Sequence, residues 1–106
     1  MSPDWRPVAA SRDVPPGRHL VVEVAGIPVA LVREGDGRLH AMMNVCPHRG
    51  GPVGEGAVRD GVITCPWHGW SFLLANGQHE RNPGVRLRTF EVREEAGRVL
   101  VAAPGA

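Results

Sequence analysis

Short runs of β-branched and aliphatic residues, separated by glycine-containing turn signals, make up most of the chain. The segments Leu20–Val24 and Ile27–Arg33 are two such runs, and the Ala25-Gly26 pair between them is typical of a tight hairpin. The turn Gly35-Asp36-Gly37 precedes a further run at Arg38–Met43. No window shows a sustained apolar period of about 3.6 residues, so the pattern predicts strands rather than helices.

The second half of the chain continues in the same way. Asp60-Gly61 separates Ala57–Arg59 from Val62–Cys65, and Asn76-Gly77 and Ala96-Gly97 mark further turns. Turn signals spaced by roughly 8–12 residues favour an antiparallel sandwich or a small barrel. The sequence therefore predicts an all-β protein.

One segment, Arg86–Arg93, has a conflict of phase. Leu87 falls on one parity of a strand, whereas Phe90 and Val92 fall on the other, so strict alternation cannot bury all three. Either a bulge bends the strand between them or Leu87 lies outside the strand. The last residues, Ala102–Ala106, are expected to form a frayed tail.

The length and the net charge of the chain exclude several classes of function. The 106 residues suit one domain, which we expect to span residues 1–106, and the formal charge of +1 predicts no binding to nucleic acid. Met1–Pro16 has no secretory apolar region, and Leu20–Val32 is too short for a membrane span of about 20 apolar residues. We therefore expect a soluble, cytoplasmic protein with no membrane partner.

Two loops hold nearly all of the candidate chemistry. The first loop is Cys46-Pro47-His48-Arg49-Gly50-Gly51-Pro52, and the second loop is Cys65-Pro66-Trp67-His68-Gly69-Trp70. Each offers one thiolate and one imidazole, and each follows a predicted strand that fixes its base. In a cytoplasmic chain, cysteine near histidine indicates metal binding rather than a disulfide.

The donor set allows two kinds of metal site. Two Cys and two His form a common zinc site, although zinc fingers usually pair Cys with Cys and His with His. Here each loop contributes a mixed pair. Two mixed loops can place both thiolates on one iron and both imidazoles on the other iron of a [2Fe–2S] cluster. A zinc-stabilised binding module is the alternative, and the colour of the protein separates the two.

The two loops resemble those of the Rieske family, and in particular the Rieske-type ferredoxins of ring-hydroxylating dioxygenase systems. The small subunits of NADH-dependent nitrite reductases are similar too. Weaker likenesses are found at Asp13–Gly17, Gly54–Gly56, Trp70–Phe72 and Asn82–Gly84. The resemblance implies an antiparallel β-sandwich or barrel with a small cluster-binding subdomain of two loops, and one [2Fe–2S] cluster per chain.

The resemblance also implies roles for single residues. Cys46 and Cys65 would bind the buried iron, and His48 and His68 would bind the outer iron. Pro83 would lie in a third loop that covers the cluster. The other histidines, outside the motifs, are expected to be surface or strand residues rather than ligands.

Departures from the high-potential members of the family predict a low reduction potential. Those relatives carry a disulfide whose cysteines correspond to Gly51 and Trp67, and they have Ser and Tyr where this chain has Trp70 and Phe72. Hydrogen bonds to the cluster sulfurs raise the potential, so missing hydroxyls place it near the low end of the Rieske range.

The sequence favours an electron-transfer component over a complete enzyme. It contains no second group of His and carboxylate residues for a mononuclear iron and no glycine-rich nucleotide motif. We expect a soluble one-electron carrier that passes electrons from a flavin-dependent reductase to a terminal oxygenase. The alternative is a small accessory subunit bound to the large subunit of an NADH-dependent nitrite reductase.

Overall fold

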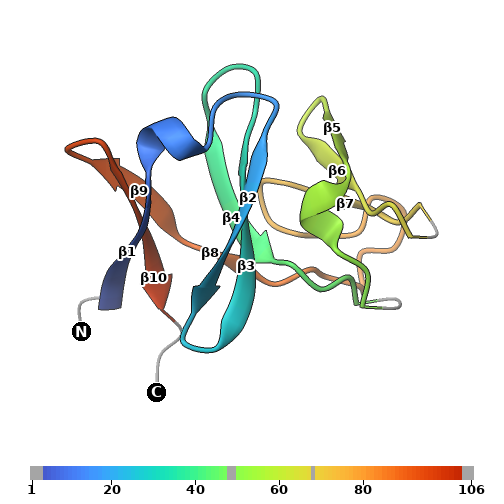
Figure 1. Cartoon of the computed structure of the whole chain (residues 1–106). Helices are drawn as coiled ribbons and strands as arrows, with labels where there is room; N and C mark the ends of the chain where they lie inside the picture. Colours follow the sequence, from blue (N-terminus) through green and yellow to red (C-terminus); the bar gives the residue numbers. More distant parts are fainter. Residues whose placement is uncertain (1–3, 48–49, 68, 104–106) are drawn as a thin grey trace.

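The computed structural model of the chain describes residues 4–47, 50–67 and 69–103. Within these ranges ten strands form three antiparallel sheets, connected by turns and two single-turn 3-10 helices (Figure 1). The all-β antiparallel fold expected from the sequence is confirmed. In the described part of the chain, no helix is long and apolar enough to cross a membrane.

The sheets follow one another along the molecule. The first sheet has the order β1-β10-β9, formed by Asp4–Ala10, Arg98–Ala103 and Val92–Glu95. The second sheet has the order β2-β3-β4-β8, formed by His19–Val24, Ile27–Arg33, Leu39–Met43 and Thr89–Phe90. The third sheet has the order β5-β6-β7, formed by Ala57–Arg59, Val62–Thr64 and Ser71–Leu73. The 3-10 helices are η1, Ser11–Asp13, and η2, Val53–Glu55.

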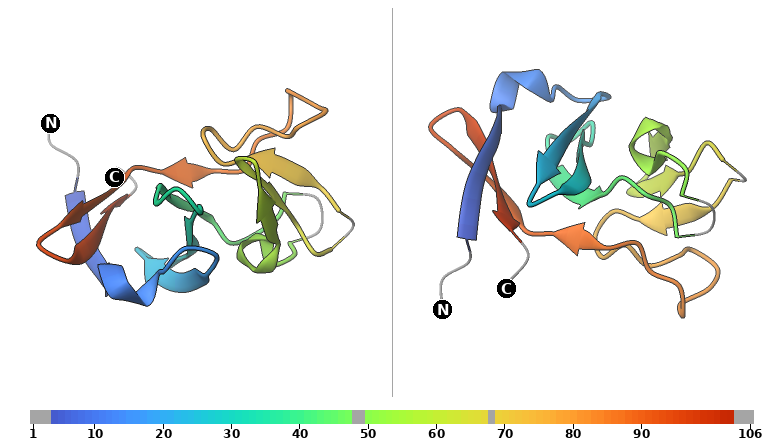
Figure 2. Two further views of the ribbon diagram at one scale, coloured as in Figure 1. Left: turned by 90° about the horizontal axis from the view of Figure 1, so that it is seen from above. Right: turned by 60° about the horizontal axis from the view of Figure 1, so that its bottom comes forward.

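The third sheet lies at the end of the molecule opposite β1 and β10 (Figures 1 and 2). The chain segment that contains β8 leads back from that end to the first sheet (Figure 2). The fold therefore separates a sandwich of the first two sheets from a small subdomain built on the third.

The hairpin turns have the backbone that their sequences predict. Ala25 and Gly26 have φ values of 50° and 81°, the left-handed conformation at both central residues that matches the twist of two antiparallel strands. Asp60-Gly61 and Ala96-Gly97 repeat this pattern. These turns set the register of β2 with β3, of β5 with β6 and of β9 with β10.

Strand β3 divides the interior into two cores, because successive side chains point to opposite faces of a strand. Val29 and Leu31 pack in the sandwich core, between the first and second sheets. Ala30 and Val32 pack in the loop core, between the second sheet and the third-sheet subdomain. The loop core contains Cys46, Val53, Ile63, Cys65, Phe72, Leu74 and Leu87.

The phase conflict is resolved by the end of a strand and not by a bulge. Leu87 precedes β8 and is buried in the loop core, whereas Phe90 and Val92 pack against the sandwich core. The expectation of a frayed tail is wrong for Ala102 and Ala103, which belong to β10 and pair with β1. Strand β1 itself was not expected, because its sequence is polar and interrupted by proline.

A buried arginine ties the first sheet to the second. Arg33, at the end of β3, is 9% exposed, and both ends of its guanidinium fork lie 2.9 Å from the carboxylate oxygens of Glu94 on β9. It also donates to the carbonyls of Val14 and Gly37. The hydrogen bonds from Arg33 to the Glu94 carboxylate are the largest cause that lowers the pKa of Glu94 to about 2.

Candidate metal centre

The two cysteines lie at the bases of the two loops. Cys46 follows β4, and Cys65 follows β6 directly. Both are free thiols and almost completely buried, with exposed fractions of 2% and 1%. The expectation that each Cys/His loop is held at its base by a strand is therefore confirmed.

Both loops close with the same backbone hydrogen bond. The N–H of Cys46 donates to the carbonyl of Gly51 at 2.9 Å, and the N–H of Cys65 donates to the carbonyl of Trp70 at 2.7 Å. In each case the acceptor lies five positions after the cysteine. The residue before each acceptor is a glycine with positive φ, 74° at Gly50 and 71° at Gly69. Two unlike sequences thus close with the same backbone hydrogen bond, each after a glycine with positive φ.

The first loop is also fixed to the second sheet. The side-chain oxygen of Asn44 accepts a hydrogen bond from the N–H of Gly54 at 2.8 Å, which holds η2 against the end of β4. A Cβ at Gly54 would lie 2.6 Å from the Cβ of Ala30, so only glycine allows η2 to pack this closely on β3. This packing places Val53 in the loop core beside the cysteines.

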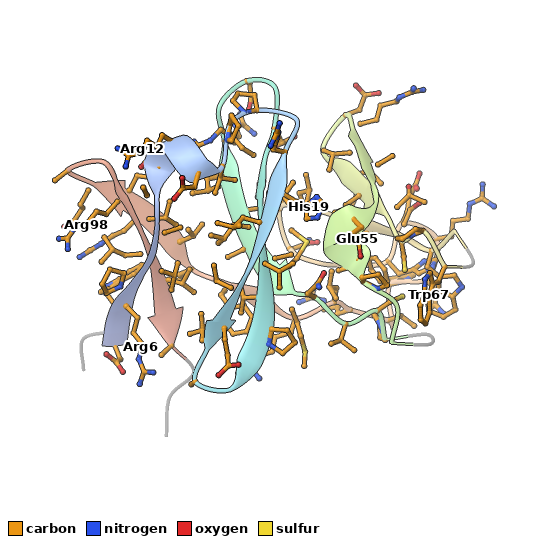
Figure 3. All side chains as sticks on the ribbon, in the orientation of Figure 1. Arg6, Arg12, His19, Glu55, Trp67 and Arg98 are labelled. Atoms are coloured by element: carbon orange, nitrogen blue, oxygen red, sulfur yellow. The ribbon has the colours of Figure 1, made fainter. Side chains whose placement is uncertain are left out.

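The two loops touch each other at Gly51 and Trp67. A Cβ at Gly51 would lie 2.8 Å from Cγ of Trp67 and 2.9 Å from its Cβ. Trp67 is nevertheless 51% exposed, at the tip of the subdomain farthest from β1 (Figure 3). Trp67 therefore contacts the first loop on one side and solvent on the other.

The third loop, residues 75–88, packs onto the loop core from a further side. Val85 and Leu87 contact the apolar residues around the cysteines, whereas Pro83 is exposed on the turn. The hydroxyls of Thr64 and Ser71 lie 2.8 Å apart and hydrogen-bond to each other. Phe72 is completely buried in the loop core, and Trp70 packs against its edge.

Burial raises the pKa of the Cys65 thiol, and the neighbouring Cys46 raises it further. A hydrogen bond from the backbone N–H of Trp67 acts in the opposite direction. Two adjacent buried thiols, unbridged and held by separate loops, fit the thiolate half of an iron–sulfur site, because bound iron supplies the positive charge that burial otherwise withholds.

The histidines divide into three groups. His48 and His68, the expected imidazole ligands, lie outside the described residues. Among the described residues no group of three or more His, Cys, Asp or Glu side chains is arranged to hold a metal ion. His40 has its Nε2 2.7 Å from Glu34, and His19 is exposed on β2 beside the third-sheet subdomain (Figure 3). His79 makes contacts that the sequence does not reveal, described below.

Comparison with known proteins identifies the class. The family model of the Rieske [2Fe-2S] domain matches residues 4–91. The chain therefore belongs to the Rieske [2Fe–2S] domain family, as the two loops indicated, and membership of this family implies a [2Fe–2S] cluster.

Similar proteins include small ferredoxins and parts of larger proteins. The ferredoxin component of the alkene monooxygenase system of Xanthobacter autotrophicus is 37% identical over 95 residues, which cover 89% of this chain and 77% of that protein. Apoptosis-inducing factor 3 of Homo sapiens is 37% identical over 93 residues, 87% of this chain. The chain spans 15% of the length of that curated relative.

A solved structure matches the whole fold. The putative NADH-dependent nitrite reductase small subunit from Mycobacterium tuberculosis superimposes with a TM-score of 0.89 and 29% identity, and the match covers 100% of both chains. The protein is thus similar in sequence to a ferredoxin component and in structure to a reductase small subunit.

Proposed function

We propose that this protein is a one-electron carrier whose single [2Fe–2S] cluster is bound by Cys46, His48, Cys65 and His68. The observation that carries the proposal is the pair of buried, unbridged thiols at the bases of two loops with the same backbone closure. When bound, the cluster supplies reversible one-electron chemistry. Residues 1–106 form the unit that we propose as one domain.

The buried and exposed sides of the loops suggest the roles of the ligands. Cys46 and Cys65 lie in the loop core, and this burial supports a role for both in binding the inner iron. His68 is followed directly by the exposed Gly69, and His48 is followed by Arg49 and then by the exposed Gly50. We therefore assign His48 and His68 to the outer iron, on the side from which electrons enter and leave.

The small number of hydrogen-bond donors near the second loop supports a low reduction potential. Phe72 brings no hydroxyl, and one of the two hydroxyl donors of Thr64 and Ser71 is used in the 2.8 Å hydrogen bond between them. The backbone N–H of Trp67, which donates to Cys65, remains as a donor to a ligand sulfur. Since donors to sulfur raise the potential, we place it near the low end of the Rieske range of roughly −150 to +300 mV.

The proposed partners are a flavin-dependent reductase as donor and a terminal oxygenase as acceptor. The sequence likeness to an alkene monooxygenase ferredoxin component supports this assignment. The tip of the subdomain exposes Pro47, Pro66 and Trp67, an apolar surface suited to a brief contact with a partner. Two free cysteines agree with a cytoplasmic location, which cell fractionation tests.

The second candidate is a small subunit of an NADH-dependent nitrite reductase. The full-length structural match to such a subunit favours it. The two candidates differ in the lifetime of the complex. A carrier exchanges partners and elutes alone in gel filtration, whereas a fixed subunit co-elutes with its large subunit when the two are expressed together.

Metal analysis and a redox titration test the proposal. We expect a brown protein with two irons and two labile sulfides per chain, a Rieske-type EPR spectrum after reduction, and a midpoint in the lower part of the family range. A colourless protein with stoichiometric zinc, even after iron–sulfur reconstitution, would refute the cluster. A midpoint near +300 mV would refute the low-potential assignment alone.

A further inference from the structure

His79 connects the third loop to the second loop. Its N–H donates to the carbonyl of Val85 at 2.9 Å, and its backbone forms an antiparallel bridge with Phe72. The imidazole meets the ring of Trp70 edge-on at 4.8 Å between centroids and the ring of Phe72 edge-on at 5.6 Å. His79 therefore contacts two aromatic residues that follow the proposed ligand His68.

One nitrogen of His79 organises the turn that follows it. The backbone N–H groups of Arg81 and Asn82 both donate to Nδ1 of His79, each at 3.0 Å. A ring nitrogen that accepts hydrogen bonds carries no proton, so these contacts require the neutral ring protonated on Nε2. Asn82 continues the turn, because its backbone carbonyl accepts from Val85 and its side chain accepts from Gly84.

The contacts of His79 lead to the surroundings of the cysteines on two sides. Val85, which the turn positions, packs against the loop core that contains Cys46 and Cys65. On the other side, Trp70 accepts the hydrogen bond that closes the second loop at Cys65. His79 is thus linked, through Val85 and Trp70, to the apolar packing around the thiols and to the base of one loop.

We propose that His79 is a positioning residue of the cluster site: its Nδ1 holds the 80–85 turn, and its ring supports Trp70, so that the third loop stays packed over the two cysteines. This inference rests on the proposed function, because it assigns the role relative to a bound cluster. It differs from a ligand role, since His79 acts through Trp70 and Val85.

Two variants separate the two contacts of His79. His79→Asn keeps an acceptor, because Oδ1 of Asn takes a place similar to that of Nδ1, but it removes the ring. His79→Phe keeps an aromatic ring but removes the acceptor. His19→Asn, on an exposed position of β2, is the matched control. Each variant is prepared with its cluster and compared with the wild type.

Amide hydrogen exchange directly measures the protection of the two backbone N–H groups that donate to Nδ1 of His79. In His79→Phe the amides of Arg81 and Asn82 are expected to exchange about tenfold faster, because each loses its acceptor. In His79→Asn and in the control, their exchange is expected to stay close to wild type. Wild-type protection of both amides in His79→Phe, or equal loss in His79→Asn, would overturn the role of Nδ1.

The midpoint potential and the EPR spectrum report on the positioning of the site. Both variants at His79 are expected to shift the midpoint and broaden the EPR signal, whereas His19→Asn leaves both unchanged. Iron-loaded variants with the wild-type midpoint and spectrum would overturn the proposal. Failure of the proposed function looks different, because the wild-type protein would then contain no iron.

Discussion

The indole of Trp67 lies directly against the α-carbon of Gly51, and this contact joins the two loops that carry the proposed ligands. The family resemblance implies that these two positions hold the cysteines of a disulfide in the high-potential members, from which this chain departs. Here an aromatic ring packed on a glycine occupies the same place. The contact leaves half of Trp67 exposed, so one residue both braces the loops and forms part of the outer surface.

A methyl group at position 51 tests this contact. Gly51→Ala would place its Cβ 2.8 Å from Cγ of Trp67, so the ring or the loop has to move. We expect a loss of about 1–3 kcal/mol in the free energy of unfolding. Thermal or urea unfolding of the iron-loaded protein measures it. Gly35→Ala is the control, because nothing lies within 4 Å of its added Cβ. Equal stability of the two variants would contradict the contact.

A disulfide is expected to replace the contact. The Cβ of Trp67 lies 2.9 Å from a Cβ built at Gly51, and disulfides need a Cβ separation of about 3.8 Å. Removal of the indole in the double variant Gly51→Cys/Trp67→Cys gives the loops room for this small adjustment. Mass spectrometry under non-reducing conditions should show the bond between positions 51 and 67, with the single variants as controls. Free thiols at both positions after oxidation would show that the loops are held differently.

Loss of one thiol should remove the cluster and the stability that it adds. Cys65→Ser is expected to be colourless and to unfold at a lower temperature than the iron-loaded wild type, because a bound cluster stabilises the native state by mass action. Its unfolding temperature should approach that of the wild type stripped of iron by a chelator. Ser71→Ala, next to the second loop, is the control and should keep its colour. A coloured Cys65→Ser protein would remove Cys65 from the ligand set.

The Arg33–Glu94 pair should make stability depend on pH. The pKa of Glu94 is lowered from 4.5 to about 2, mainly by the Arg33 hydrogen bonds, so this stabilisation is complete above about pH 4.5 and is lost as the pH falls towards 2. Glu94 is 36% exposed and partly screened. We therefore expect Glu94→Gln to cost about 1 kcal/mol at pH 7.

Thermal melts between pH 7 and pH 3 measure this dependence as the difference between wild type and Glu94→Gln. The difference should shrink as the pH falls. Glu95→Gln is the control, because Glu95 pairs with Arg93 in an exposed ion pair and its loss should change stability little at any pH. A difference for Glu94→Gln that stays constant down to pH 3 would show that the charge of Glu94 does not contribute.

The sequence alone determined the local features of this protein. Turn pairs such as Asp60-Gly61 specify their own backbone, because glycine adopts positive φ without strain and aspartate adopts it more readily than most residues, and the flanking alternation then sets the strands. The two Cys/His loops were evident for a similar reason, since metal ligands must be close in the chain to share one loop tip. Strand β1 was missed, because its pairing with β10 depends on a partner almost a whole chain length away.

Only the tertiary structure decided how distant segments meet at the site. No spacing rule connects Gly51 to Trp67, or His79 to Trp70, since those contacts depend on the packing of the second and third sheets around the loop core. The burial of Leu87 was decided in the same way. Alternation left two solutions open. The structure selected the second, because β8 begins at Thr89 and Leu87, outside the strand, packs in the loop core. Ligand motifs and turns can be recognised from residues that are neighbours in the sequence. Close packing involves surfaces that form only after the chain has folded.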